Sequence, residues 1–183
     1  MNEPIRLLPV TNAAQVAQVA RMAREVWDEY YVPLIGRAQV DYMVAKFQTA
    51  EAMQAQIDSG YEYFQIRQSG QIPQSGQIRQ AGEAIGYAAI RHDAAEARLF
   101  ISKLYLLAAH RKAGAGRQCL DLIERMARER AVTRLWLTVN KGNPSVRAYE
   151  RLGFSIAEAI VMDIGGGYVM DDYRMEKPVT PAR

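Results

Sequence analysis

An apolar run, a glycine-rich basic stretch and an amphipathic segment follow one another between residues 97 and 131. The run ARLFISKLYLLAA predicts a long strand over 97–109, and RQCLDLIERMARERA predicts a helix that begins near residue 117. HRKAGAGR, at 110–117, joins the two. Glycine destabilises a helix opening, so Gly114 and Gly116 indicate either a tight turn or a cradle for an anion. A strand that turns into a helix in this way indicates a layered domain in which helices cover a sheet.

Similar periodicities divide the rest of the chain into strands and helices. The predicted strands cover 5–10, 61–67, 83–93, 133–140, 154–164 and 168–177. The predicted helices cover 11–31, 38–47, 49–60 and 143–153, and Thr11 or Asn12 caps the first of them. One hairpin region comes before a stretch in which strands and helices alternate, and a second hairpin closes the chain. This mixture predicts an α+β or α/β sandwich with helices on both faces of the sheet.

Composition places the chain among ordinary soluble globular proteins. Its 183 residues are 49% hydrophobic and 23% charged, so we expect one domain at 1–177 and a tail at 178–183. The N-terminus lacks a signal-peptide core and no apolar stretch approaches about 20 residues, so we expect a cytoplasmic protein without a membrane partner. A net charge of only +3 argues against a nucleic-acid partner. With one cysteine and two histidines, we expect neither a disulfide nor a metal site.

A hexapeptide is duplicated between the strands predicted over 61–67 and 83–93. SGQIPQ at 69–74 recurs as SGQIRQ at 75–80. Two copies are too few for a solenoid, so we expect an extended hairpin loop at 69–80 that serves as a tolerated surface insertion.

Known phosphate-binding motifs do not fit the glycine stretch. A P-loop requires Lys-Ser or Lys-Thr after its last glycine, whereas Gly116 is followed by Arg117 and Gln118. A dinucleotide fingerprint requires a small residue where Cys119 stands, and we expect Cys119 to pack in the core. The remaining arrangement, Arg111-x-x-Gly114-x-Gly116, is either an anion cradle at a helix start or a tight turn with solvated arginines.

Two segments resemble the GCN5-related N-acetyltransferase (GNAT) superfamily. They are LYLLAAHRKAGAGRQCL at 104–120 and NPSVRAYERLGF at 143–154, and the resemblance extends over about 83–177. DIGGGYVMDDYRMEK and the pair WDEYY and QVDYM also look like the PaiA-type polyamine acetyltransferases. The resemblance implies a mixed, mostly antiparallel twisted sheet of about seven strands with helices on both faces. It implies transfer of an acetyl group from acetyl-CoA to a primary amine, a polyamine or other small amine, or a protein amine.

The resemblance also implies which residues hold acetyl-CoA. Leu104, Tyr105 and Leu106 correspond to the family strand that diverges from its neighbour and whose backbone pairs with the pantetheine arm. The amide near Leu106 would polarise the thioester carbonyl. The diphosphate would be held, largely by main-chain N–H groups, at Arg111, Lys112, Ala113, Gly114, Ala115, Gly116 and Arg117. Asn143 would contact the CoA arm, although it lies one residue closer to Tyr149 than is usual, so Asn140 is an alternative.

Tyr149 corresponds to the tyrosine that protonates the departing thiolate. A phenol stays protonated at neutral pH and can donate that proton. The alternative interpretation is a core aromatic residue that packs against Phe154.

The acceptor would meet the first long helix, at Trp27, Glu29, Tyr30 and Tyr31. Acidic and aromatic side chains suit a cationic amine, although a solvated helix face is an equal alternative. No motif identifies the general base. Its candidates are Glu25, Asp28 and Glu29, and the pair Asp171 and Asp172, of which at most one can face the cleft because neighbours in a strand point to opposite faces. We assign no catalytic role to Ser102 or Lys103.

Two other readings of the chain remain open. A non-catalytic CoA-binding sensor or interaction module could use the same fold. Exposed edges of the final hairpin would permit a homodimer.

Overall fold

The computed structural model describes residues 4–68, 82–111 and 113–180, which form seven strands and six α-helices. The strands are β1 (Ile5–Pro9), β2 (Tyr61–Gln68), β3 (Glu83–Asp93), β4 (Arg98–Leu106), β5 (Arg134–Asn140), β6 (Ser155–Gly165) and β7 (Tyr168–Pro178). The helices are α1 (Ala13–Tyr30), α2 (Val32–Ile35), α3 (Arg37–Phe47), α4 (Ala50–Asp58), α5 (Ala115–Glu129) and α6 (Ser145–Arg151), with a 3₁₀ turn, η1, at Ala108–His110.

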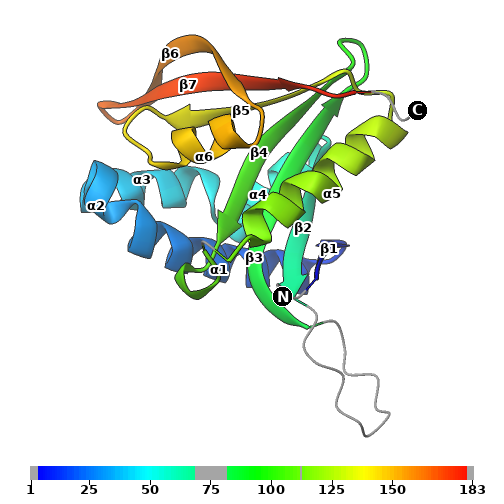
Figure 1. Cartoon of the computed structure of the whole chain (residues 1–183). Coiled ribbons are helices and arrows are strands. Elements are labelled where there is room, and N and C mark those ends of the chain that lie inside the picture. The colour runs from blue at the N-terminus through cyan, green and yellow to red at the C-terminus, as the bar shows by residue number, and fades with distance from the viewer. Residues whose placement is uncertain (1–3, 69–81, 112, 181–183) are drawn as a thin grey trace, which may run out of the picture.

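One sheet with the strand order β1-β2-β3-β4-β5-β7-β6 runs through the molecule (Figure 1). Every neighbouring pair is antiparallel except β4 and β5, which are parallel. Helices α1 to α4 cover one face, and α5 and α6 cover the other (Figure 1). The predicted fold, a mixed and mostly antiparallel sheet between two helical layers, is confirmed.

The parallel strands β4 and β5 pair only at their beginnings. The register joins Arg98 to Arg134, Leu99 to Leu135 and Phe100 to Trp136, and the rings of Phe100 and Trp136 stack 4.0 Å apart at that point. Beyond it the strands diverge, while β4 stays paired with β3 and β5 stays paired with β7 (Figure 1). The later part of β4 therefore has one backbone edge that no strand covers.

The core is divided by the sheet. On one side the apolar stripe of α5, with Cys119, Leu120 and Ile123, packs against β3, β4 and β5. On the other side two clusters lie under α1, α3 and α4, one around Val19 and Met53 and the other around Trp27 and Val40. The core position predicted for Cys119 is confirmed, and its thiol is fully buried.

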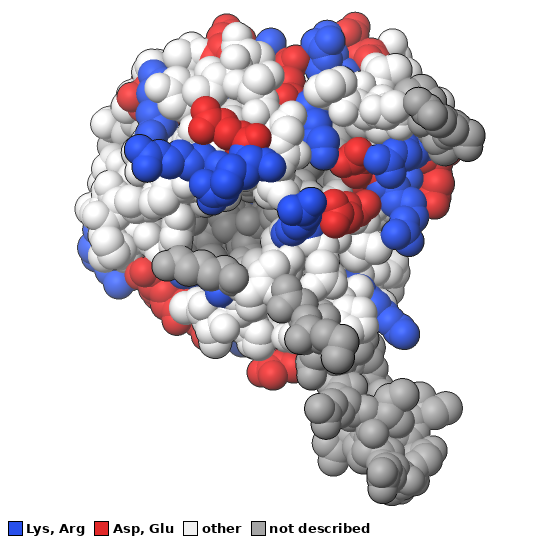
Figure 2. All heavy atoms as spheres, viewed as in Figure 1, with Lys and Arg blue, Asp and Glu red and all other residues white. Residues whose placement is uncertain are grey.

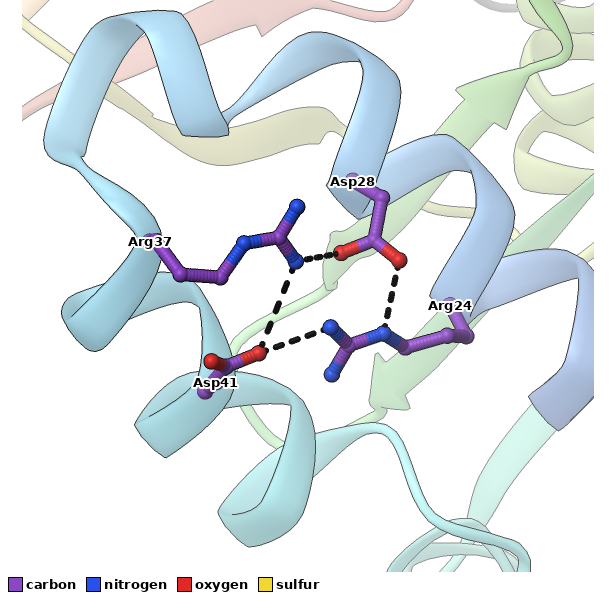
Figure 3. Close-up of polar contacts among 4 residues, drawn as sticks. All are labelled: Arg24, Asp28, Arg37 and Asp41. Atoms are coloured by element: carbon purple, nitrogen blue, oxygen red, sulfur yellow. Dashed lines mark hydrogen bonds and ion pairs between the residues drawn. The ribbon is translucent and has the colours of Figure 1, made fainter.

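Four charged side chains join α1 to α3 at the surface (Figure 3). Arg24 contacts Asp28 at 2.8 Å and Asp41 at 2.7 Å, and Arg37 contacts Asp28 at 2.5 Å and Asp41 at 3.6 Å. Exposed ion pairs of this kind each contribute little to stability, about 0–1 kcal/mol. They join α3 to the part of α1 that carries Trp27.

Most predicted boundaries agree with the structure, and one does not. Asn12 caps α1 by accepting a hydrogen bond from the Gln15 amide. The strand predicted over 97–109 ends at Leu106. The Leu107 amide still donates to Ile85 O, but the His110 amide donates to Leu107 O, so the chain turns into η1 instead of extending. Apolar residues alone did not distinguish this turn from a strand.

Several predictions fall partly outside the described residues. The duplicated hexapeptide at 69–80 lies outside them, as do Lys112 and the last three residues of the predicted tail. Within the described part, no helix is long and apolar enough to cross a membrane, and no three potential metal ligands gather. The strand β6 forms one edge of the sheet and exposes Val161 and Met162, but pairing between two copies stays a prediction.

Candidate active site

The start of α5 lies beside the end of β4. The backbone requires glycine at Gly114 but not at Gly116. Gly114 is the N-cap residue with φ +79°, a left-handed conformation that disfavours any side chain. Gly116 has no such requirement, because a Cβ there would meet only Leu106 Cδ1, at 3.8 Å. The first-turn amides have no intrahelical acceptors, and no side chain caps this helix. Folding explains Gly114, whereas the open space beside Gly116 is suited to a ligand.

A third glycine, which the sequence analysis missed, fixes the end of β4. A Cβ at Gly86 of β3 would lie 2.2 Å from Tyr105 O and 2.9 Å from Leu106 Cδ2. The two strands therefore approach too closely for any side chain at this position. The close approach also fixes amide directions: since the Leu107 amide donates to Ile85 O, the preceding amide, of Leu106, points to the uncovered edge of β4.

Arg111 connects the glycine stretch to α1. Its Nε donates to Leu106 O at 2.8 Å, its guanidinium lies 4.8 Å from the centre of the Tyr30 ring, and its Nη2 lies 3.5 Å from Glu29 Oε2. Its side chain is thus already engaged with β4 and α1, so a role on the diphosphate stays a prediction for this residue. Of the other predicted cradle residues, Ala115 is buried in the core while Ala113 and Arg117 are exposed.

Tyr30 bridges the two sides of the diverging strands. Its hydroxyl donates to Asn143 Oδ1 at 2.8 Å, and the same oxygen accepts the Ser145 amide at 2.8 Å. Asn143 is only 5% exposed, so its carbonyl oxygen is used within the protein. Asn140, the alternative, donates to Asp171 O and accepts the Gly142 amide. Tyr30 lies between Arg111 and Asn143, just before α6, and its predicted contact with the acceptor stays a prediction.

Tyr149 fits both interpretations that the sequence left open. Its ring packs edge-on against Phe154 with ring centres 5.6 Å apart. Its hydroxyl makes no hydrogen bond to the described residues and so is free to donate. Burial, followed by the neighbouring Cys119 and Tyr30, raises the pKa of Tyr149, which keeps the phenol protonated at neutral pH.

Aromatic rings line the α1 side of β4. Trp27 stacks on Tyr31 at 4.4 Å, and both approach Tyr105 of β4, at 6.0 Å and 6.1 Å between ring centres. Trp27 is 4% exposed and Tyr31 and Tyr105 are half-buried. Burial raises the pKa of both tyrosines well above the ordinary value. Trp27 and Tyr31 thus lie together beside Tyr105, and Glu29 lies beside Arg111. That these residues bind the acceptor stays a prediction.

The acidic candidates differ in what surrounds them. Asp28 belongs to the α1–α3 ring of charges, where partial burial is outweighed by hydrogen bonds from Arg24 and Arg37 that hold its pKa below the ordinary value. Glu25 borders a shallow groove with Arg21 and Arg67, toward β2. Asp171 pairs with Lys141. Asp172 is 6% exposed, and it is the member of that pair that turns inward.

Burial shifts the pKa of two further side chains, Lys103 and Cys119, in opposite directions. Lys103, to which the sequence analysis gave no catalytic role, is 5% exposed, donates to Gln56 Oε1 at 2.7 Å, and has a pKa lowered to about 8 by burial. Burial raises the pKa of Cys119 to about 12, so its thiol is not a nucleophile at neutral pH. Neither spacing nor a local motif distinguished Lys103 from a surface lysine.

The face that carries α5 and α6 is hollowed beside these residues. Figure 2 shows the hollow between α6 and the end of β4, with Lys and Arg side chains along its border. The uncovered edge of β4, the open start of α5 and a cationic border together form a site for an extended anionic ligand.

Comparison with known proteins agrees with this geometry. Residues 23–154 match the acetyltransferase (GNAT) family model. The chain therefore belongs to the acetyltransferase (GNAT) family. The predicted family is thereby confirmed.

Individual relatives are more distant. A streptothricin acetyltransferase from Streptomyces lavendulae is 38% identical over 71 residues, which is 38% of this chain and 38% of that protein. The PaiA N-acetyltransferase of Thermoplasma acidophilum, solved in complex with coenzyme A, has a TM-score of 0.68 at 16% identity and aligns over 95% of this chain and 98% of that one. A nourseothricin acetyltransferase has a TM-score of 0.54 at 23% identity over 67% and 68% of the two chains.

Proposed function

We propose that this protein transfers an acetyl group from acetyl-CoA to a primary amine, by direct attack of the amine within a ternary complex. The observation that carries the proposal is the divergence of β4 from β5 next to the open helix start at Gly116, with the free hydroxyl of Tyr149 on the adjoining α6 segment. The structural neighbour solved with coenzyme A supports the same ligand class.

Acetyl-CoA fits the site by its two polar parts. Its diphosphate would accept hydrogen bonds from the amides of the first turn of α5, where the helix dipole favours an anion. Its pantetheine amides would pair with the uncovered edge of β4 at Leu104 to Leu106, as an added strand does.

The chemistry requires two donors at the thioester. The Leu106 amide, which points to the uncovered edge, would stabilise the negative charge that develops on the carbonyl oxygen. Tyr149 would protonate the departing thiolate, a role for which its protonated state at neutral pH is suited. Cys119 is buried and holds its proton, so the residues favour direct transfer without an acetyl-enzyme.

The acceptor would approach from the α1 side, where the half-buried rings of Tyr31 and Tyr105, which pack on the buried Trp27, are suited to a cationic amine. Polyamines and other small amines are cations of this kind and are the proposed acceptors. Streptothricin and nourseothricin, which the names of two relatives contain, belong in the same acceptor panel.

The direct test is a thiol-release assay with acetyl-CoA and a panel of polyamines, antibiotics and amino-terminal peptides. We expect acetyl-CoA-dependent thiol release that is matched by acetylated amine in the mass spectrum. A non-catalytic CoA-binding sensor would instead bind acetyl-CoA in a calorimeter and release no thiol with any amine. Folded protein that does neither would contradict the proposal.

Replacing Gly116 with alanine is expected to lower acetyl-CoA affinity without lowering the free energy of unfolding. The added methyl meets only Leu106 Cδ1 at 3.8 Å, so the free energy of unfolding should stay equal or rise by about 0.5–1 kcal/mol. The methyl would occupy the space next to the diphosphate and lower acetyl-CoA affinity about tenfold or more, which is about 1.4 kcal/mol. Titration calorimetry and chemical denaturation measure the two effects.

Gln54→Ala, at an exposed position of α4, is the control for a general change in helix stability. It should leave acetyl-CoA affinity unchanged. Unaltered affinity in the Gly116→Ala protein would place the diphosphate elsewhere.

A further inference from the structure

We propose that Asp172 of β7 binds the ammonium group of the acceptor amine and accepts its proton before the amine attacks. The inference rests on the proposed function, because it assigns the general base of that same reaction. Its carrying observations are the burial of this carboxylate, the absence of a cation paired with it among the described residues, and its position on the aromatic side of the sheet.

The register of β7 decides which way Asp172 points. Tyr173 and Met175 pack into the core cluster on the α5 side of the sheet. Since alternate side chains share a face, Asp172 points to the other side, as do Tyr168 and Met170, which pack against the cluster around Trp27. Asp171 points the opposite way, and its side chain is 51% exposed and paired with Lys141.

The carboxylate of Asp172 is unusual among the acids of this chain. It is 6% exposed, and no ion pair joins it to a described lysine or arginine. Arg174, the next residue on the same face, contacts Glu158 and Glu176 instead. A buried carboxylate without a cationic partner costs stability, so its retention is explained when a cationic ligand completes the pair.

The charged and titratable groups around Asp172 set its protonation. Burial, followed by the charge of Asp171, raises the pKa of Asp172 to about 6, against opposing effects of Lys141 and of a hydrogen bond with Asn140. The carboxylate contributes to the raised pKa of Tyr105 across the diverging strands. At neutral pH Asp172 is thus ionised and basic enough to take a proton.

Tyr105 lies on the same side of the sheet as Asp172 and packs against the rings of Trp27 and Tyr31. Its ring lies 6.0 Å from Trp27 and 6.1 Å from Tyr31, on the same side of the sheet as Asp172. A carboxylate next to aromatic faces is the combination that binds an ammonium group, through charge and cation–π attraction. The amine would then lie between β7 and the uncovered edge of β4, where the thioester is proposed to lie.

The proton balance of the reaction closes with two residues. The ammonium gives one proton to Asp172, directly or through one water, and Asp172 later releases it to solvent. The neutral amine forms the C–N bond to the thioester carbon, the C–S bond breaks, and the thiolate takes the Tyr149 proton. The Tyr149 phenolate recovers a proton from the nitrogen of the new amide.

The test replaces Asp172 with asparagine, which keeps the shape and removes the charge, and uses Asp171→Asn as the matched control on the exposed face. Asp172→Asn should lower kcat/KM for a strongly basic amine by about 10²–10⁴-fold with unchanged acetyl-CoA affinity. The loss should shrink sharply for hydroxylamine, which is already neutral at the assay pH. At neutral pH Asp171→Asn should keep most of the wild-type kcat/KM with both acceptors. Its acid limb should move to lower pH, because the charge of Asp171 that raises the pKa of Asp172 is removed.

The pH profile gives an independent readout that needs no variant. Wild-type kcat/KM for the basic amine should fall as pH decreases through about 6, because protonated Asp172 no longer accepts a proton. Asp172→Asn should lose this acid limb. An equal loss for basic and weakly basic acceptors, or a wild-type profile without the limb, would overturn the assignment while leaving the acetyltransferase reaction intact; absent wild-type turnover would instead contradict the proposed function.

Discussion

Tyr149→Phe is expected to lower the turnover of amine acetylation by about 10²–10⁴-fold and to leave acetyl-CoA affinity nearly unchanged. The substitution removes only the hydroxyl, which makes no hydrogen bond to the described residues, and it keeps the ring that packs on Phe154. Stability should therefore change little. Steady-state kinetics, titration calorimetry and thermal unfolding measure the three quantities on the same preparation.

The leaving group provides the sharper form of this experiment. An acetyl thioester of an acidic aromatic thiol needs no proton donor, so with it the Tyr149→Phe defect should largely disappear. Tyr61→Phe, in β2 beside Arg91, is a control that should behave as wild type. Wild-type turnover in the Tyr149→Phe protein, or a large loss of acetyl-CoA affinity, would show that Tyr149 has a structural role instead.

Gly86→Ala is expected to have the largest effect on the fold itself. The new Cβ would lie 2.2 Å from Tyr105 O and 3.1 Å from Leu106 Cα, and both atoms belong to the backbone of β4. Because neither can move without displacing the strand, we expect a loss of about 2–3 kcal/mol in the free energy of unfolding. The shifted Leu106 should also weaken acetyl-CoA binding in the protein that remains folded.

Chemical denaturation and acetyl-CoA titration check this prediction. Gly142→Ala is the matched control, since its Cβ would meet only a side-chain oxygen, of Asn140, at 3.3 Å. Its stability should stay close to wild type. Gly86→Ala protein as stable as wild type, with unchanged affinity, would contradict the close strand contact described for β3 and β4.

The sequence predicted those parts of the fold that depend on local pattern. The alternation in YEYFQIR and EAIGYAAIRHD identified β2 and β3, and Asn12 marked the start of α1. The segments 104–120 and 143–154 together identified the family, because each motif is contained in one continuous stretch of the sequence.

Features that depend on contacts between distant segments could not be predicted in the same way. The divergence of β4 from β5 depends on which strands pair. No local pattern in 101–106 encodes it, and only the family resemblance implied it. Gly86 looked like any other strand glycine until Tyr105 lay against it. Tyr30 contacts Arg111 and Asn143, which are more than 80 residues away, and neither contact can be read from its helix alone.

The acidic candidates illustrate the same limit. Alternation along β7 established that Asp171 and Asp172 point to opposite faces, but not which face lies inward. That required the packing of Tyr173 and Met175 against the α5 side. Likewise Asp28 resembled a general base in the sequence, and only its contacts with Arg24 and Arg37 show that it serves the packing of α3 on α1 (Figure 3).

The central claim is direct transfer from acetyl-CoA to an amine at the diverging strands, with no acetylated intermediate of the protein. Initial rates measured over a grid of acetyl-CoA and amine concentrations test it most directly. The account predicts double-reciprocal lines that intersect, because both substrates must be bound before the C–S bond breaks. Parallel lines, accompanied by an acetylated protein in the mass spectrum, would contradict it.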